Sequence, residues 1–184
     1  MDATIDEVLN LLWSGAASEY FGEPVTQLDH AMQAADLARK SGADDETVIA
    51  ALLHDVGHLL PNDPSRVSEI GAIDHEELGA DFLRRRGFSA RVVTLVQGHV
   101  AAKRYLTATN PSYYERLSEA SRKTLALQGG PMSPAEAAAF EASVLKQDLL
   151  RLRGWDEQAK VPGAPAPPLE TYRPMIQAHL AQRV

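Results

Sequence analysis

The residues with the clearest chemical potential lie in one run, Ala-Ala-Leu-Leu-His-Asp-Val-Gly-His, which contains His54, Asp55 and His58. Two imidazoles and a carboxylate close an apolar segment, and packing alone does not explain that arrangement. Further His and Asp residues are spaced along the chain on either side of it. The candidate metal ligands are His30, His54, Asp55, His75, His99 and Asp156. This set supplies enough nitrogen and oxygen ligands for two metal ions.

These ligand types favour a catalytic metal site over a structural one. Imidazole nitrogen binds Fe, Zn, Mn, Co and Ni, whereas carboxylate oxygen favours harder cations, so the residues leave the metal's identity open. The two oxygens of Asp55 can bridge two cations. When two metals share these ligands, coordination positions remain open for other molecules, as a catalytic site requires.

Each of the other histidines, taken alone, has a simpler explanation. A lone His30 would more often be a packed or surface residue, and a lone His99 would be a buried histidine bonded to a carbonyl. His75 stands among acidic residues, as at a solvated helix start. The company of His54 and Asp55 reverses these preferences, and the set as a whole indicates metal binding.

Two histidines are assigned differently. His58 lies one helical turn after His54, on the same face, so we expect it at the pocket edge as a substrate contact rather than a ligand. His179 has no such neighbours and is predicted to lie on the surface.

The elements that must position these residues are predicted to be helices throughout, in an all-α fold. Alanine and leucine are abundant, and Ile5, Val8, Leu9 and Leu12 recur at helical spacing. Capping residues and Gly or Pro breaks give the other boundaries. We expect helices at about 26–40, 45–58, 75–86, 111–116, 118–127 and 145–160, a helix capped by Ser89, another capped by Ser133 with a capping box to Glu136, and a last one from Leu169.

The connections follow from composition. The Pro61-Asn62-Asp63-Pro64 run is expected to break the chain, with a loop continuing to about Ile73. Residues 161–168 are rich in Pro and Ala and are expected to form an extended connector to the C-terminal helix. No repeat and no second core is indicated, so residues 1–184 are predicted to form a single domain.

Composition excludes several classes of protein. The 184 residues contain no cysteine, which excludes disulfides, thiolate metal sites and a cysteine nucleophile. The net charge of −7 without a long basic run argues against a nucleic-acid partner. No apolar run approaches the ~20 residues of a membrane span, and no signal peptide is indicated. We therefore expect a cytoplasmic protein; the composition leaves its oligomeric state open.

The ligand series resembles that of a known family. His30, the His54-Asp55 pair and Asp156 resemble the metal-binding signature of the HD-domain superfamily, whose members are all-helical. With the added His75 and His99 the series looks like the two-metal subset, which holds both phosphohydrolases and diiron oxygenases.

A narrower resemblance is carried by short motifs. The chain is similar to the HD-domain oxygenases that cleave organophosphonates in Gly-Glu-Pro-Val-Thr-Gln at 22–27 and Gln-Gly-Gly-Pro-Met at 128–132. Further matches begin at Tyr20, His99, Leu117 and Trp155, so the resemblance covers about residues 20–162.

This resemblance implies a mixed-valent Fe(II)/Fe(III) pair and dioxygen as co-substrate. One iron would be held by His30, His54, Asp55 and Asp156, and the other by the bridging Asp55 with His75 and His99. Tyr20 would occupy a position on the second iron until substrate arrives. The expected catalytic residues are Asp55, His58 and Tyr20.

The resemblance also implies a pocket for a small zwitterionic phosphonate. Glu23 would receive the amine, while Lys103 and Ser121 would bind the phosphonate near His58. The residues agree, because Lys103 lies one turn after His99 and Glu23 offers an anion beside Tyr20. Gln128 is equally a pocket donor or a turn residue, and Asp29 is expected to tune the amine pocket.

The expected reaction is oxidative cleavage of the C–P bond in a 1-hydroxy-2-(amino or trimethylammonio)ethylphosphonate. Its products would be phosphate and glycine or glycine betaine. An alternative is a metal-dependent phosphohydrolase acting on a phosphate ester or nucleotide, since the same ligands permit it. A third possibility is a regulatory HD domain without activity, which a missing ligand would favour; none is missing.

Overall fold

The computed structural model describes residues 2–20, 22–61, 67–68 and 71–182. The α-helices in these ranges are α1 (Asp2–Ser14), α2 (Gln27–Lys40), α3 (Asp45–Leu53), α4 (His75–Arg85), α5 (Ala90–Thr109), α6 (Pro111–Arg116), α7 (Glu119–Leu127), α8 (Pro134–Glu141), α9 (Lys146–Gln158) and α10 (Arg173–Ala181). The 3-10 helices are η1 (Gly15–Ala17), η2 (Val56–Leu59) and η4 (Leu169–Tyr172). The strands are β1 (Glu19–Tyr20), β2 (Glu23–Thr26), β3 (Val67–Ser68) and β4 (Gly71–Ala72). The prediction of an all-α fold is confirmed.

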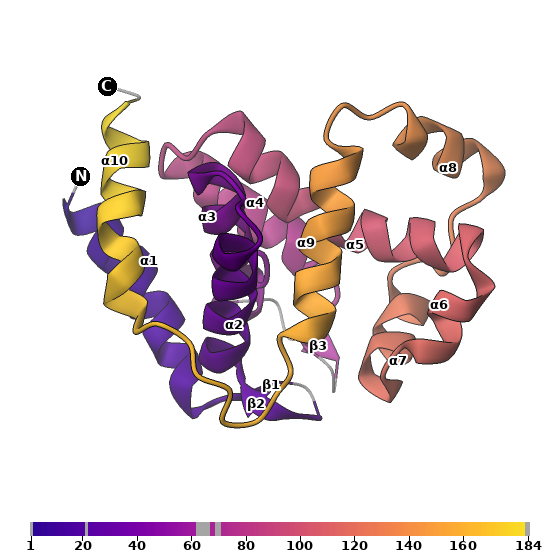
Figure 1. The fold of residues 1–184 in the computed structure, drawn as a ribbon, viewed down its shortest axis with the longest axis horizontal. Helices are drawn as coiled ribbons and strands as arrows, with labels where there is room; N and C mark the ends of the chain where they lie inside the picture. Colours follow the sequence, from indigo (N-terminus) through magenta and orange to yellow (C-terminus); the bar gives the residue numbers. More distant parts are fainter. Residues whose placement is uncertain (1, 21, 62–66, 69–70, 183–184) are drawn as a thin grey trace.

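The helices that carry the predicted ligands form the centre of the molecule. α2, α3 and α9 lie side by side, and α5 packs against both α3 and α9 (Figure 1). α4 packs on α5 and on η2. Helices α1 and α10 pair at one end, while α6, α7 and α8 gather at the other (Figure 1). The main hydrophobic core runs through this assembly and includes Leu12, Leu53, Leu83, Leu95 and Leu152.

Local sequence sets most helix starts. Thr26 and Asp29 form a reciprocal capping box at α2, and Ser133 and Glu136 form the predicted one at α8. The side chains of Ser89 and Ser118 cap α5 and α7 by accepting backbone N–H groups. The predicted boundaries of these helices are therefore correct to within a residue or two.

The predicted helix over 45–58 is wrong at its C-terminal end. α3 ends at Leu53, Asp55 leaves helical geometry with φ −102° and ψ 10°, and η2 follows. Gly57 explains the break, because its backbone lies directly against the start of α4. A Cβ at position 57 would lie 1.9 Å from the carbonyl oxygen of His75, so a residue with a side chain does not fit at this position. The predicted Pro-Asn-Asp-Pro break lies largely outside the described residues.

The sequence reading also missed a small hairpin. β1 and β2 pair antiparallel, with Tyr20 opposite Glu23 and Glu19 opposite Thr26. Gly22 has φ +82° within the turn, a conformation that glycine adopts without strain. The hairpin is too short for a period-two pattern to be visible. It places Tyr20 and Glu23 beside the start of α2, and β3 pairs with β4 in a second short ladder.

The C-terminal part returns to the first helices. The predicted connector 161–168 runs from the end of α9 past the β1–β2 hairpin towards α10 (Figure 1). The prediction that His179 lies on the surface is wrong. Its side chain is buried because α10 packs on α3, and its Nε2 accepts a hydrogen bond from the backbone N–H of Ser89 at 3.1 Å.

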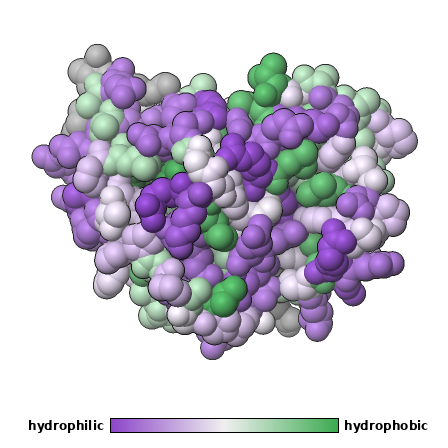
Figure 2. Space-filling model, viewed as in Figure 1, coloured by the Kyte–Doolittle hydropathy of each residue, from purple (hydrophilic) through white to green (hydrophobic). Residues whose placement is uncertain are grey.

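Polar residues cover most of the face seen in Figure 2, with small apolar groups between them. Among the described residues, no helix combines the length and the apolar character needed to cross a membrane.

Candidate metal centre and adjoining pocket

The first cluster of ligands joins α2, the end of α3 and α9. The Nε2 atoms of His30 and His54 lie 3.1 Å apart. Oδ2 of Asp55 lies 3.6 Å from Nε2 of His30 and 3.4 Å from that of His54. Oδ1 of Asp156 lies 3.4 Å from Nε2 of His30. These atoms converge on one point, as the ligands of a single cation do.

A second cluster shares Asp55 and joins it to α4 and α5. The Nε2 atoms of His75 and His99 also lie 3.1 Å apart. Each lies 3.3 Å from Oδ1 of Asp55, the oxygen that faces away from the first cluster. His30, His54 and Asp55, and likewise Asp55, His75 and His99, each form a group that could hold a metal ion. The two oxygens of Asp55 therefore face one cluster each, which is the arrangement that a bridging carboxylate needs.

Backbone carbonyls orient all four imidazoles. The Nδ1 atoms lie 2.9 Å from Ala159 O for His30, 2.9 Å from Ala51 O for His54, 3.2 Å from Ala72 O for His75 and 2.7 Å from Val96 O for His99. A carbonyl only accepts, so each neutral ring carries its proton on Nδ1 and directs the Nε2 lone pair inward. Metal-bound histidines in proteins have this second hydrogen bond.

The facing Nε2 atoms within each pair of histidines show whether a metal ion fits. Two nitrogen acceptors 3.1 Å apart repel each other unless a positive charge lies between them. Zinc-type metal–nitrogen bonds of about 2.0–2.1 Å place two neighbouring ligands of one ion roughly 3 Å apart. Oδ1 of Asp156 is also buried without a hydrogen-bond partner among the described residues, whereas its Oδ2 accepts from Arg153. The residues present fit a metal pair.

The charges in the clusters also favour a cation. Burial raises the pKa of the Asp55 carboxyl, but His54, His75 and His99 outweigh burial and hold that pKa well below its usual range. Burial lowers the pKa of His54, but Asp55 and Asp156 outweigh it and raise that pKa to about 9. A proton on His54 and a metal ion thus compete for the same carboxylates.

Two predicted catalytic side chains border the clusters. The Tyr20 hydroxyl donates to Oδ2 of Asp55 at 2.7 Å, and its ring stacks on His30 with centroids 4.0 Å apart. The ring of His58 stacks on that of His75 with centroids 3.9 Å apart, and His58 lies outside both ligand groups. Burial, followed by the adjacent His75, holds the pKa of His58 well below its usual range.

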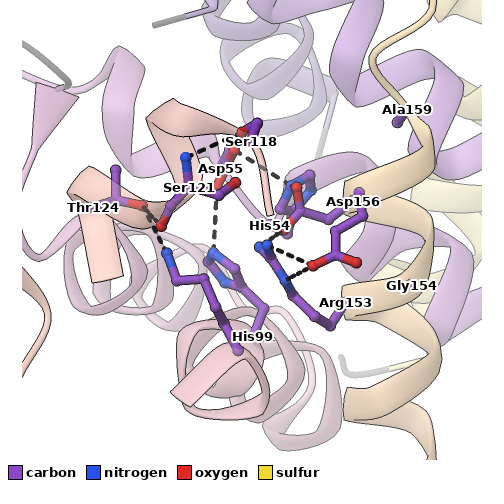
Figure 3. A network of polar contacts seen from close by, with 12 residues as sticks. His54, Asp55, His99, Ser118, Ser121, Thr124, Arg153, Gly154, Asp156 and Ala159 are labelled. Carbon is purple, nitrogen blue, oxygen red and sulfur yellow. Dashed lines mark hydrogen bonds and ion pairs between the residues drawn. The ribbon is translucent and has the colours of Figure 1, made fainter. Parts of the chain in front are cut away.

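A pocket opens on the side of the clusters that faces α7. Its lining includes Tyr20, Glu23, His58, Lys103, Ser121 and Gln128, all predicted to contact substrate. Lys103 donates to the Thr124 hydroxyl at 2.8 Å, and His99 and Asp55 line the same pocket; Figure 3 shows Thr124, His99 and Asp55. Burial, with Arg153 next in importance, lowers the pKa of Lys103 to about 7. Oε1 of Gln128 is buried without a hydrogen-bond partner among the described residues, which favours its role as a pocket group.

Asp29 does not lie where it is predicted. Its carboxylate accepts from the backbone N–H of Thr26 at 3.3 Å and from the Thr26 hydroxyl at 2.8 Å, and the residue is exposed. It does not line the pocket beside the metal clusters. The helix-capping preference of an aspartate at this position explains the difference, because the capping geometry turns the carboxylate away from the adjacent His30.

Three polar lining residues were missed by sequence reasoning: Thr124, Arg153 and Lys160. Helical spacing could have found the first two, since Thr124 lies one turn after Ser121 and Arg153 one turn before Asp156. Lys160 lies in the matching stretch that begins at Trp155, but its partner Glu23 is 137 residues away, so no local pattern marks it.

Comparisons with known proteins identify the family of this chain. The HD domain family matches residues 28–141, a span that includes every predicted ligand except Asp156. The chain therefore belongs to the HD domain family.

Among its relatives, the [1-hydroxy-2-(trimethylamino)ethyl]phosphonate dioxygenase (glycine-betaine-forming) of Leisingera caerulea is 41% identical, over 86% of this chain and 81% of the relative. Hydroxymethylphosphonate dioxygenase of Gimesia maris is 42% identical, over 88% and 81%. An uncharacterized protein of Acanthamoeba polyphaga mimivirus is 37% identical, over 97% and 82%. The predicted resemblance is confirmed, and the chain is an enzyme of the oxygenase class.

Proposed function

We propose that this protein is a dinuclear iron oxygenase that cleaves the C–P bond of a small 1-hydroxyphosphonate carrying an ammonium group. The observation that carries the proposal is the placement of two ligand clusters, joined by Asp55, beside a pocket with cationic and hydroxyl groups. The two phosphonate dioxygenases among the relatives support it, and one of them is named for a trimethylamino substrate.

The metal pair would be held by the six predicted ligands, with Asp55 between the two ions. His30, His54 and Asp156 complete one ion's set, and His75 and His99 complete the other. Iron bound there would supply a site for dioxygen and the redox steps of the oxidation. The carbonyls that hold the Nδ1 atoms keep the four rings in place throughout.

The protein's own groups would bind and orient the substrate. The Lys103 ammonium, with the Ser121 and Thr124 hydroxyls beside it, suits a phosphonate dianion. Glu23 and the Tyr20 ring offer an anion and an aromatic face to an ammonium group. The depressed pKa of His58 keeps its ring neutral near neutral pH, so it adds no cation to the pocket.

The proposed reaction balances with one molecule of dioxygen. A C–H bond and the C–P bond of the hydroxyphosphonate break, and the carbon is oxidised to a carboxylic acid while phosphorus leaves as phosphate. Both oxygen atoms of dioxygen are accounted for in these products, so no further oxidant or reductant is needed. An amino substrate would give glycine, and a trimethylammonio substrate would give glycine betaine.

Phosphate release tests the proposal. The protein is loaded with Fe(II) and incubated in air with hydroxymethylphosphonate and with 1-hydroxy-2-aminoethylphosphonate and its trimethylammonio form. We expect phosphate and the matching carboxylic acid in air and none under anaerobic conditions, because hydrolysis needs no dioxygen whereas this reaction does. Cleavage of phosphate esters without oxygen, and of no phosphonate, would instead identify a phosphohydrolase.

A further inference from the structure

Lys160 holds a position that the proposed chemistry has not used. Its ammonium lies 3.3 Å from Oε1 of Glu23 and 3.3 Å from the Ser121 hydroxyl, which accepts from it. The same ammonium lies 5.6 Å from the centre of the Tyr20 ring. The side chains of Lys160 and Glu23 are each only 13% exposed. An internal ammonium thus contacts the very carboxylate and ring that suit a substrate ammonium.

The backbone fixes Lys160 at this place from both sides. The carbonyl of Ala159 accepts from Nδ1 of the ligand His30 at 2.9 Å. The side chain of Gln33 donates to the carbonyl of Val161 at 3.0 Å and accepts from its N–H at 3.2 Å. Lys160 is therefore held between two residues anchored to α2, next to the metal centre, unlike a lysine on a free surface.

Helix α7 presents one hydroxyl to each of two lysines. Thr124 accepts from Lys103 at 2.8 Å, and Ser121 accepts from Lys160 at 3.3 Å. The two hydroxyls are three residues apart and lie on one face of the helix, as Figure 3 shows. Two ammonium groups and two hydroxyls that line one pocket suit a dianion with three oxygens better than a single lysine does.

We propose that Lys160 determines specificity by exchanging partners with the substrate. Before binding, Lys160 neutralises Glu23. A zwitterionic phosphonate inserts between them, so that the phosphonate pairs with Lys160 and the substrate ammonium pairs with Glu23. This inference rests on the proposed function and gives the means by which the site would prefer hydroxyphosphonates with an ammonium group over amine-free ones.

The pairing of charges makes the exchange selective for a zwitterion. With a zwitterion, one internal ion pair is replaced by two, and no partly buried charge is left without a partner. An amine-free hydroxyphosphonate can pair with Lys160 only by leaving Glu23 without its cation. A partly buried carboxylate without a partner is unfavourable, so amine-free substrates should bind more weakly.

Two substitutions test the exchange, with binding measured by calorimetry on iron-loaded protein without oxygen and KM measured in air. Lys160→Met should weaken binding of 1-hydroxy-2-aminoethylphosphonate and of hydroxymethylphosphonate, each by about tenfold. Glu23→Gln should change the two affinities in opposite directions. It should weaken binding of the aminophosphonate by about tenfold and strengthen binding of hydroxymethylphosphonate, because Lys160 no longer has to give up a carboxylate partner.

The exposed pair of Glu119 and Lys123 on α7 supplies matched controls. Neither residue lines the pocket, so Glu119→Gln and Lys123→Met should leave both affinities unchanged. Metal content of every variant, compared with wild type, distinguishes a lost contact from a damaged centre. The idea is overturned if Glu23→Gln weakens both ligands alike, or if Lys160→Met changes neither while wild type binds and turns over. Failure of wild type to bind or oxidise any phosphonate would remove the proposed function itself, and the exchange with it.

Discussion

At the scale of single residues, hydrogen bonds on the outer side of each ligand define the centre. Four carbonyls hold Nδ1 of His30, His54, His75 and His99, and three of them belong to the residue three positions earlier. Arg153 donates to Oδ2 of Asp156, while Oδ1 remains directed at the clusters. The ligands are therefore preorganised, which lowers the entropy lost when a metal binds.

Lys103 illustrates a conflict between stability and binding. Its pKa is about 7 in the folded protein, against 10.5 for an ordinary lysine, because burial disfavours the charged form. The unfolded chain therefore binds more protons between pH 7 and 10.5. By linkage, the free energy of unfolding rises with pH across that interval and carries the full penalty below it.

Lys103→Met should consequently stabilise the metal-free protein. We expect a gain on the order of 3 kcal/mol in the free energy of unfolding at pH 7, together with a loss of at least about tenfold in phosphonate affinity. Denaturant unfolding at pH 6, 8 and 10 measures the first, and calorimetry measures the second. The rise with pH due to Lys103 should disappear. A variant less stable than wild type at pH 7 would contradict the argument, and the exposed Lys123→Met should change neither quantity.

At the scale of elements, the turn after α3 decides how the two clusters are joined. The helix stops at Leu53, so Asp55 is free of helical geometry and can direct one oxygen to each cluster. Gly57 then allows η2 to lie against the beginning of α4, where His75 stands. The close approach of these two backbones fixes the separation of Asp55 and His75.

Gly57→Ala should therefore damage one cluster selectively. The new Cβ would lie 1.9 Å from the His75 carbonyl, so α4 must shift and carry His75 away from Asp55 and His99. We expect the bound iron, measured by mass spectrometry, to fall from two atoms per chain to about one, since the ligands of the first cluster lie on other elements.

Gly154→Ala is the matched control for this substitution. Gly154 lies in α9, two residues before Asp156, and a Cβ there would meet only the side chain of Gln158 at 3.9 Å. Alanine in a helix interior is favoured over glycine by roughly 1 kcal/mol. This variant should keep its full metal content and gain slightly in stability. Full metal content in Gly57→Ala would refute the positioning role.

At the scale of the whole molecule, the metal ligands tie distant parts of the chain together. They come from α2, the turn after α3, α4, α5 and α9, which are otherwise joined mainly by apolar packing. The clusters concentrate the Asp55 and Asp156 carboxylates and four imidazoles in the buried centre. The proposed metal pair would offset this charge and crosslink five segments at once.

Removing the metal should therefore destabilise the whole fold. We expect a chelator to lower Tm by about 10 °C, since tight binding to the folded state alone contributes roughly 4 kcal/mol at a thousandfold excess over Kd. Protons compete at His54, whose pKa is about 9, so the difference in Tm should be larger at pH 8 than at pH 6. Differential scanning calorimetry with and without added Fe(II) measures it, and an unchanged Tm would refute the crosslinking role.

The sequence by itself determined what depends on residue type and short-range spacing. The ligand set was predictable because packing alone does not explain an apolar run that ends in His54 and Asp55, with further His and Asp residues spaced on either side. Helix starts at Thr26, Ser89 and Ser133 were predictable because a cap is made by residues within one turn of each other. The place of Lys103 in the pocket was implied by the family resemblance, and its spacing of one helical turn after His99 agreed with it.

Tertiary structure decided what depends on contacts between distant segments. The pairing of Glu23 with Lys160, the burial of His179 where α10 packs on α3, and the end of α3 before Gly57 all require knowing which backbone lies against which. For Asp29 the error was of the opposite kind. The residue was predicted to lie at the pocket, but its carboxylate accepts from Thr26 in a local helix cap. Caps and helix spacing depend on interactions between residues close in sequence, so the sequence shows them directly. Which distant residue a side chain contacts is decided only when the helices pack.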